Sequence, residues 1–242
     1  MIALADVLAP GQPIREVEPG LFSVLAVGDE GAAYDTRAAA YDRLVSSRWY
    51  SQLAWGVDPA VHTDFILRAL TSEAEGWVLD VAAGSCVPSA AAYPKTSRPV
   101  VVLDRSLVML RRGMARVRES HGSIPPRLCF LQADATALPF RSDAFATVLC
   151  HGALHVFPSP RPVCSEWQRV LARAGSLYVS SLVRGRWLGD RYLALLHRTG
   201  EIAQPRTPGE VDALLEAALA APAQMRVLGN FAYLSLQARP RA

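Results

Sequence analysis

Short apolar runs alternate with amphipathic stretches from residue 77 to the end of the chain. The runs are rich in β-branched residues, which is typical of parallel strands buried on both faces. We predict strands at 77–81, 99–104, 128–134, 146–151 and 176–183, and a final hairpin of 225–229 and 231–238 around Gly229-Asn230. This order predicts an α/β fold: a doubly wound, Rossmann-like, mostly parallel sheet of seven strands with a C-terminal antiparallel hairpin.

Helices are predicted where apolar residues recur every three or four positions. Residues 34–55 and 59–70 show this spacing, and Ser106 is placed to cap a helix after the second strand. Further helices are expected at 161–175, ending at Gly175, and after the capping box that starts at Thr207. Between the first two strands, Pro88 and Pro94 limit the expected helix to two turns.

The first 33 residues show no clear period and predict an N-terminal arm. We therefore divide the chain into an arm with lid helices, 1–58, and a main domain, 59–242. The lid segment holds Tyr34, Tyr41, Trp49, Tyr50 and Trp55, which could stack on a flat acceptor or pack on the sheet. Arg184, Arg186, Trp187 and Tyr192 could supply a second wall for an acceptor.

Composition narrows the class of protein. A 242-residue chain with 51% hydrophobic and 19% charged residues is globular, and its net charge of +3 gives no global case for nucleic acid or a membrane as partner. No basic leader precedes the first apolar run, and no run reaches the ~18 residues of a membrane span. The four cysteines form no CxxC pair, so we expect buried thiols, no metal and a cytoplasmic protein.

In an open α/β sheet, ligands bind beyond the carboxyl ends of the strands. The residues there belong to four ordered segments: "VLDVAAGS" (78–85), "VVVLDRSLVMLRRGMAR" (100–116), "LQADATALPFRSDAFATVLCHGALHVFPSP" (131–160) and "EWQRVLARAGSLYVSSL" (166–182). Because these four segments occur in this order, residues 34–240 resemble a class I S-adenosylmethionine-dependent methyltransferase of the ubiquinone/menaquinone type.

The resemblance implies S-adenosyl-L-methionine as cofactor and a small-molecule acceptor, and leaves a homodimer open. Asp104 would accept hydrogen bonds from the ribose hydroxyls, and Asp134 with Ala135 would read the adenine. Asp80 would face the methionine ammonium. The cofactor-binding residues that it implies are Tyr41, Asp80, Ala82, Gly84, Asp104, Arg105, Met109, Asp134, Ala135 and His151. Simpler alternatives are a solvated strand-end carboxylate for Asp104, helix core for Met109 and a turn cap for Asp134.

The glycine-rich turn departs from the family pattern, because only Gly84 of "AAGSC" is a glycine. Ala82 is tolerable there if its φ stays negative. Cys86 stands where the family has another glycine, and is either a small filler or a thiol activated at a helix start. Retained carboxylates favour a modified cofactor site over a lost one.

Two histidines follow the fourth strand, at positions 151 and 155. We predict His155 as the catalytic base for a protonated acceptor and His151 as a residue lining the cofactor; either could instead bond the backbone. Two other functions stay open: a fold repurposed as a cyclase or decarboxylase, and a non-catalytic subunit without cofactor. A role in secondary metabolism is consistent with the leading hypothesis.

Overall fold

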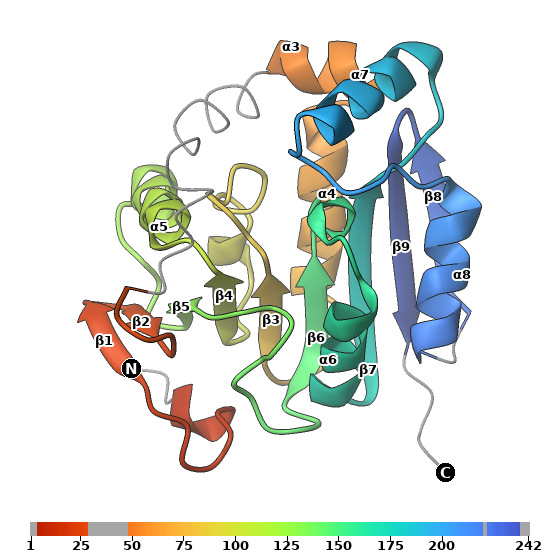
Figure 1. Ribbon diagram of the computed structural model, residues 1–242. Coiled ribbons are helices and arrows are strands. Elements are labelled where there is room, and N and C mark those ends of the chain that lie inside the picture. The colour runs from red at the N-terminus through yellow and green to blue at the C-terminus, as the bar shows by residue number, and fades with distance from the viewer. Residues whose placement is uncertain (1–3, 29–47, 220–221, 238–242) are drawn as a thin grey trace.

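The protein forms one mixed sheet covered by helices on both faces, as seen in a computed structural model (Figure 1). The structure describes residues 4–28, 48–219 and 222–237. The strands are β1 (Arg15–Glu18), β2 (Leu21–Ser23), β3 (Val78–Val81), β4 (Val100–Asp104), β5 (Leu128–Gln132), β6 (Phe145–Cys150), β7 (Leu171–Leu182), β8 (Gln224–Leu228) and β9 (Phe231–Gln237). The helices are α3 (Arg48–Tyr50), α4 (Pro59–Leu70), α5 (Leu107–His121), α6 (Arg161–Val170), α7 (Trp187–Arg198) and α8 (Pro208–Leu219).

The strand order is β1-β2-β5-β4-β3-β6-β7-β9-β8. Strands β2, β5, β4, β3, β6 and β7 are parallel to one another, and β1 is antiparallel to β2. At the other side, β9 is antiparallel to β7 and forms the predicted C-terminal antiparallel hairpin with β8. The predicted α/β, Rossmann-like fold is confirmed. The predicted count of seven strands is wrong, because the N-terminal arm adds β1 and β2 to the edge of β5. These strands are too short for a period to show.

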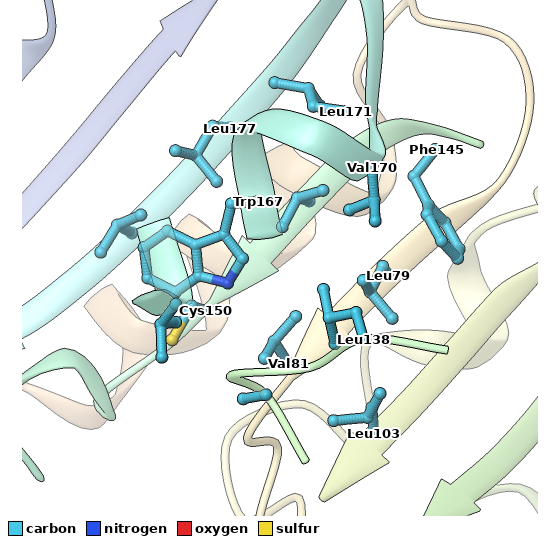
Figure 2. Packing of buried hydrophobic residues seen from close by; sticks show 14 of the residues in the cluster. Leu79, Val81, Leu103, Leu138, Phe145, Cys150, Trp167, Val170, Leu171 and Leu177 are labelled. Atoms are coloured by element: carbon cyan, nitrogen blue, oxygen red, sulfur yellow. The ribbon is translucent and has the colours of Figure 1, made fainter. Parts of the chain in front are cut away.

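The sheet separates two hydrophobic layers because successive strand residues point to opposite faces. Leu79 and Val81 pack with α6 and α8, while Val78 and Val100 pack with α4 and α5. Trp167 of α6 is at the centre of the first layer, with aliphatic side chains of β3, β4 and β7 around it (Figure 2). Burial on both faces explains why the central strands read as unbroken apolar runs.

Several expected helix ends are confirmed. The Ser106 side chain accepts a hydrogen bond from the Met109 N–H, and α5 ends at Gly122 in the left-handed conformation. Thr207 and Glu210 exchange hydrogen bonds at the start of α8, as the capping box predicted. These caps determine the residue at which each helix begins, and so the length of the loop that precedes it.

Two helix predictions are wrong. Helix α6 ends at Val170 rather than Gly175, because Leu171 already pairs with β6 and the next residues form a bulge with Ala174 at φ 61°. Between β3 and β4 the chain makes turns and only a 3-10 turn over Tyr93–Lys95, where the sequence predicted two turns of α-helix. Prolines at 88 and 94 leave too little uninterrupted chain for an α-helix.

The helices α3 and α7, with the π-helical turn η2 (Ser51–Trp55), lie at the end of the sheet toward which β3 and β6 point, and η2 and α7 adjoin the turn between β8 and β9 (Figure 1). We call α3, η2 and α7 the cap. Tyr50, Trp55 and Tyr192 hold it together, with the Tyr50 hydroxyl donating to the Tyr192 hydroxyl at 3.1 Å. Within the described ranges, no helix has the length and apolar character needed to span a bilayer.

Candidate active site

Three carboxylates mark the carboxyl ends of neighbouring strands. Asp80 lies in β3, Asp104 ends β4, and Asp134 follows β5 by two residues. Because these strands are adjacent and parallel, the sheet places the three carboxylates along one edge. The structure therefore brings together the acidic residues that the sequence predicted for one site.

Asp80 is buried, and its two carboxylate oxygens differ. Oδ2 accepts a 2.6 Å hydrogen bond from the Tyr93 hydroxyl, whereas Oδ1 is buried with no partner among the described residues. Burial raises the pKa of Asp80 to about 7, and nearby Asp104 adds to the rise against the Tyr93 hydrogen bond. An unsatisfied buried oxygen is costly, so Oδ1 is suited to a cationic donor from a ligand.

Asp104 organises the loops on either side of it. Its Oδ2 accepts from the Gly84 N–H at 2.8 Å, and its Oδ1 accepts from the Ser106 N–H at 2.9 Å. The carboxylate thus ties the glycine turn after β3 to the start of α5.

The glycine turn is in the left-handed conformation at three positions. The φ values are 54° for Ala82, 55° for Gly84 and 57° for Cys86. The condition that we set for Ala82, a negative φ, is not met, so both non-glycine residues are strained. A Cβ on Gly84 would meet nothing within 4 Å, which leaves open space beside the Gly84 backbone where a ligand could approach.

Cys86 is a buried filler. A Cβ built on Gly113 of α5 would lie 2.7 Å from the Cys86 Sγ, so the thiol occupies the space that a side chain at 113 would need. Burial, mainly, raises the pKa of Cys86 to about 12, and the nearby Asp80 carboxylate adds to the rise. A thiol with this pKa is not an activated nucleophile. All four cysteines are free and buried, as the sequence predicted for Cys129 and Cys150.

Asp134 is engaged with its own loop and with Arg105. Arg105 Nη1 donates to Oδ2 at 2.7 Å, and the Thr136 N–H and hydroxyl both donate to Oδ1, at 2.8 and 2.6 Å. Burial raises the pKa of Asp134, but the Thr136 and Arg105 contacts outweigh it and the net shift is downward. About one of its roughly four acceptor sites remains for a further donor.

The remaining predicted cofactor residues divide into two groups. Ala135 and Met109 are buried beside the same loops, Ala135 directly after Asp134 and Met109 in the first turn of α5. Tyr41 lies outside the described residues. Their contacts with a cofactor stay predictions.

His151 follows β6 and is surrounded by aromatic rings. Its Nδ1 lies 2.7 Å from the Ser180 hydroxyl, and its ring contacts His62 edge to face at a centroid distance of 5.0 Å. The His62 ring in turn stacks edge to face on Phe231. Burial, together with the neighbouring His62 and His155, lowers the pKa of His151 well below its usual value. The imidazole at this edge is therefore neutral.

His62, on α4, has a defined tautomer. The Ser51 hydroxyl donates to the Val57 carbonyl, so it must accept from the His62 Nε2–H, 3.3 Å away. Nδ1 then accepts from the Tyr233 hydroxyl at 2.9 Å. Burial lowers the pKa of His62 to about 4, against the attraction of Asp58.

His155 is buried in the turn after β6. Its Nδ1 accepts a hydrogen bond from the Leu182 N–H at 3.2 Å, so the proton of the neutral ring is on Nε2. Burial, with Arg206 nearby, lowers its pKa to about 3. To act as a base at Nε2, the ring would have to shift its tautomer and release Leu182. The base role of His155 stays a prediction.

Three residues that position the site were missed by the sequence analysis. Tyr93 and Ser180 hold Asp80 and His151, and Gln132 bridges the Ser23 hydroxyl and the Arg105 carbonyl. Each lies far in sequence from the residue that it holds. A polar residue inside an apolar strand, as with Gln132 and Ser180, was the available clue.

Comparison with known proteins agrees with this geometry. Residues 79–179, which run from β3 into β7, match the methyltransferase domain family. Residues 79–179 are therefore similar to a methyltransferase domain. The chain is similar in particular to the ubiquinone/menaquinone-type branch, as the four segments predicted.

A demethylmenaquinone methyltransferase from Renibacterium salmoninarum is 37% identical over 103 residues, which is 43% of this chain. The chain spans only 40%, 57% and 60% of the length of three such curated relatives. Among solved structures, the [4+2]-cyclase SpnF has a TM-score of 0.66 at 16% identity, over 88% of this chain and 95% of its own. A phosphoethanolamine N-methyltransferase 2 from Haemonchus contortus, in complex with S-adenosyl-L-methionine, has a TM-score of 0.62 at 13% identity, over 88% and 59%. At these identities the structures show the fold alone.

Proposed function

We propose that this protein is an S-adenosyl-L-methionine-dependent methyltransferase that acts on a small-molecule acceptor. The observation that carries the proposal is the unpartnered Oδ1 of Asp80, beside Asp104, in the domain that matches the methyltransferase family. A buried carboxylate oxygen without a donor is unfavourable unless a ligand supplies one. The methionine ammonium of the cofactor is such a donor.

The remaining residues fit the same ligand. Asp104 would accept from the ribose hydroxyls, Asp134 and Ala135 would bind the adenine edge, and Met109 would lie against its face. The open space beside Gly84 would admit the cofactor between these anchors. Arg105 and His151 would line the site, and Tyr41 is proposed for it by sequence alone. The replaced glycines do not block this space, because the Cys86 side chain points at α5 instead.

The cofactor supplies an electrophilic methyl group, and the protein's task is to align an acceptor with it. The acceptor side is lined by neutral imidazoles and aromatic rings, which bind a flat or apolar molecule without charge. His155 could donate its Nε2–H to an acceptor oxygen in the tautomer that the structure shows. It could take an acceptor proton only in the other tautomer. A quinone-like acceptor, as the relatives' names suggest, and a role in secondary metabolism are both compatible with this chemistry.

Calorimetry tests the proposal most directly. Wild-type protein should bind S-adenosyl-L-methionine and S-adenosyl-L-homocysteine, and Asp80→Asn should weaken both at least about tenfold by removing the charge opposite the ammonium. Glu119→Gln, which removes an exposed carboxylate on α5, is the matched control. Absence of binding by the folded wild-type protein would favour a non-catalytic subunit. Binding without transfer to any quinone, phenol or amine in a radiolabelled-methyl assay would favour a repurposed fold.

A further inference from the structure

Large apolar side chains are exposed together on the cap. Trp49, Leu53, Trp187, Leu188 and Leu195 have exposed fractions of 74%, 69%, 68%, 59% and 51%. They account for five of the eight large hydrophobic residues exposed in the described part of the chain, and the other three are on the arm and β8. Scattered surface hydrophobics need no explanation, but a cluster of this kind marks an interaction surface.

Packing of helix α7 against the sheet keeps these apolar side chains on its outer face. A Cβ on Gly189 would lie 2.0 Å from the side chain of Asn230, so the helix backbone is pressed against the turn between β8 and β9. Asn230 also donates to Asp190 at 2.8 Å, and Leu193 is buried on the same side. The exposed residues Trp187, Leu188, Arg191, Leu195 and Arg198 follow at helical spacing on the opposite face. The apolar outer face is thus fixed by packing.

This face is also basic. Residues 184–198 contain four arginines and one aspartate. Arg184 precedes α7 and lies 3.8 Å from Glu210, so the positive charges on the outer face of the helix are Arg191 and Arg198. The aspartate, Asp190, already accepts from Asn230 and from the Gly185 N–H. The guanidinium of Arg191 lies over the Trp187 ring, 5.2 Å from its centroid. The small global charge therefore hides a local concentration of positive charge around exposed tryptophan and leucine.

We infer that the cap binds the surface of an anionic lipid membrane. Tryptophan and leucine that enter the interface, flanked by arginines that reach lipid phosphates, are the combination that interfacial helices use. A second copy of the chain fits less well, because a twofold interface would bring the arginines of both copies together. The cap lies at the same end of the sheet as the carboxylates, so binding would turn the site toward the membrane (Figure 1).

Sedimentation with vesicles tests this inference without any assay of methyl transfer. We expect at least roughly tenfold stronger binding to vesicles with 30% phosphatidylglycerol than to pure phosphatidylcholine, and weaker binding at high salt. The triple variant Trp187→Ser/Leu188→Ser/Leu195→Ser should bind the anionic vesicles at least about tenfold more weakly than wild type. The affinity of Arg191→Gln/Arg198→Gln for these vesicles should fall roughly fivefold for each charge removed.

The control is Ile14→Ser/Val27→Ser, which removes exposed apolar residues of the N-terminal arm rather than of the cap and should bind as wild type. Circular dichroism and thermal melting establish that each variant is folded. Equal affinity for both vesicle types, or no loss in the triple variant, would overturn the inference. So would a concentration-dependent dimer that the triple variant abolishes, since the cap would then bind a second copy. Neither result depends on cofactor binding.

Discussion

The two halves of the candidate site differ in charge: one is lined by carboxylates and the other by neutral histidines. On the β3, β4 and β5 side, carboxylates accept hydrogen bonds from backbone N–H groups, a tyrosine and an arginine. On the β6 and β7 side, His62, His151 and His155 are buried with lowered pKa values, and His62 and His151 lie among aromatic rings. The first half is prepared for a charged, polar ligand and the second for an uncharged one. That division matches a charged cofactor and an apolar acceptor.

The largest expected effect is on the acidic half. Asp104→Asn should weaken S-adenosyl-L-homocysteine binding at least about tenfold, because a charge-assisted contact contributes about 1.5–3 kcal/mol. The amide can still accept from one of the two backbone N–H groups, so the fold should survive. Calorimetry on Asp104→Asn and on Glu119→Gln measures the loss against a neutral control. Unchanged affinity would remove Asp104 from the cofactor site.

The histidine half should make stability sensitive to acid. The folded pKa of His62, about 4, is below its ordinary value of 6.5, so the unfolded chain binds more protons between these values. Stability contributed by neutral His62 is therefore lost as the pH falls from 6.5 toward 4. From pH 7 to 5 the loss is about 2 kcal/mol.

Denaturant titrations at pH 7 and pH 5 give the free energy of unfolding of wild type and of His62→Gln. The wild type should lose more stability between the two pH values than the variant does. His121→Gln, on the exposed end of α5, controls for the substitution itself. Asp80 acts with the opposite sign. Its pKa is raised from 3.8 to about 7, so its contribution is full below 3.8 and is lost as the pH rises to 7. The Asp80 contribution is present in both proteins, so the comparison with His62→Gln isolates the contribution of His62. If both proteins lose the same stability between pH 7 and pH 5, His62 is not held neutral by burial.

A smaller effect distinguishes structure from chemistry at His155. An asparagine there could accept from the Leu182 N–H as Nδ1 does, whereas alanine would leave that buried donor unpaired at a cost of about 1–3 kcal/mol. We expect His155→Asn to keep stability and turnover, and His155→Ala to lose stability. Thermal melting and initial rates on the same preparations check both. A hundredfold drop in turnover for folded His155→Asn would instead assign the base role that the sequence predicted.

The smallest effect concerns the strained glycine turn. Gly113→Ala alone should destabilise the protein, because its Cβ would meet the Cys86 Sγ. In the Cys86→Gly background, the same change should be neutral or stabilising by about 1 kcal/mol, since alanine favours the helix and fills the space. A double-mutant cycle by chemical denaturation gives the coupling. Additive effects would mean that Cys86 and Gly113 do not share one space.

The sequence pattern predicted the features that have a local signature, which are the strands and the helix caps. Buried parallel strands, the Ser106 cap and the Thr207 capping box all have local signatures, and the carboxylates followed from the strand ends. The backbone at Ala82 could not be predicted, because a positive φ in a non-glycine residue is imposed by its surroundings. The partners of His155 and Asp80 are also distant in sequence, as Leu182 and Tyr93 show. Periodicity carries no information about such pairs.

The β1–β2 hairpin has a consequence for how molecules of this protein meet. An uncovered β5 would present unpaired backbone N–H and C=O groups to a strand of another molecule, but β2 pairs with it and leaves β1 as the outermost strand on this side. That strand is Arg15-Glu16-Val17-Glu18, and Arg111 of α5 reaches Glu18 at 2.8 Å. Charged side chains on a short border strand discourage growth of the sheet into a neighbouring molecule. The hairpin thus protects this side of the sheet against aggregation.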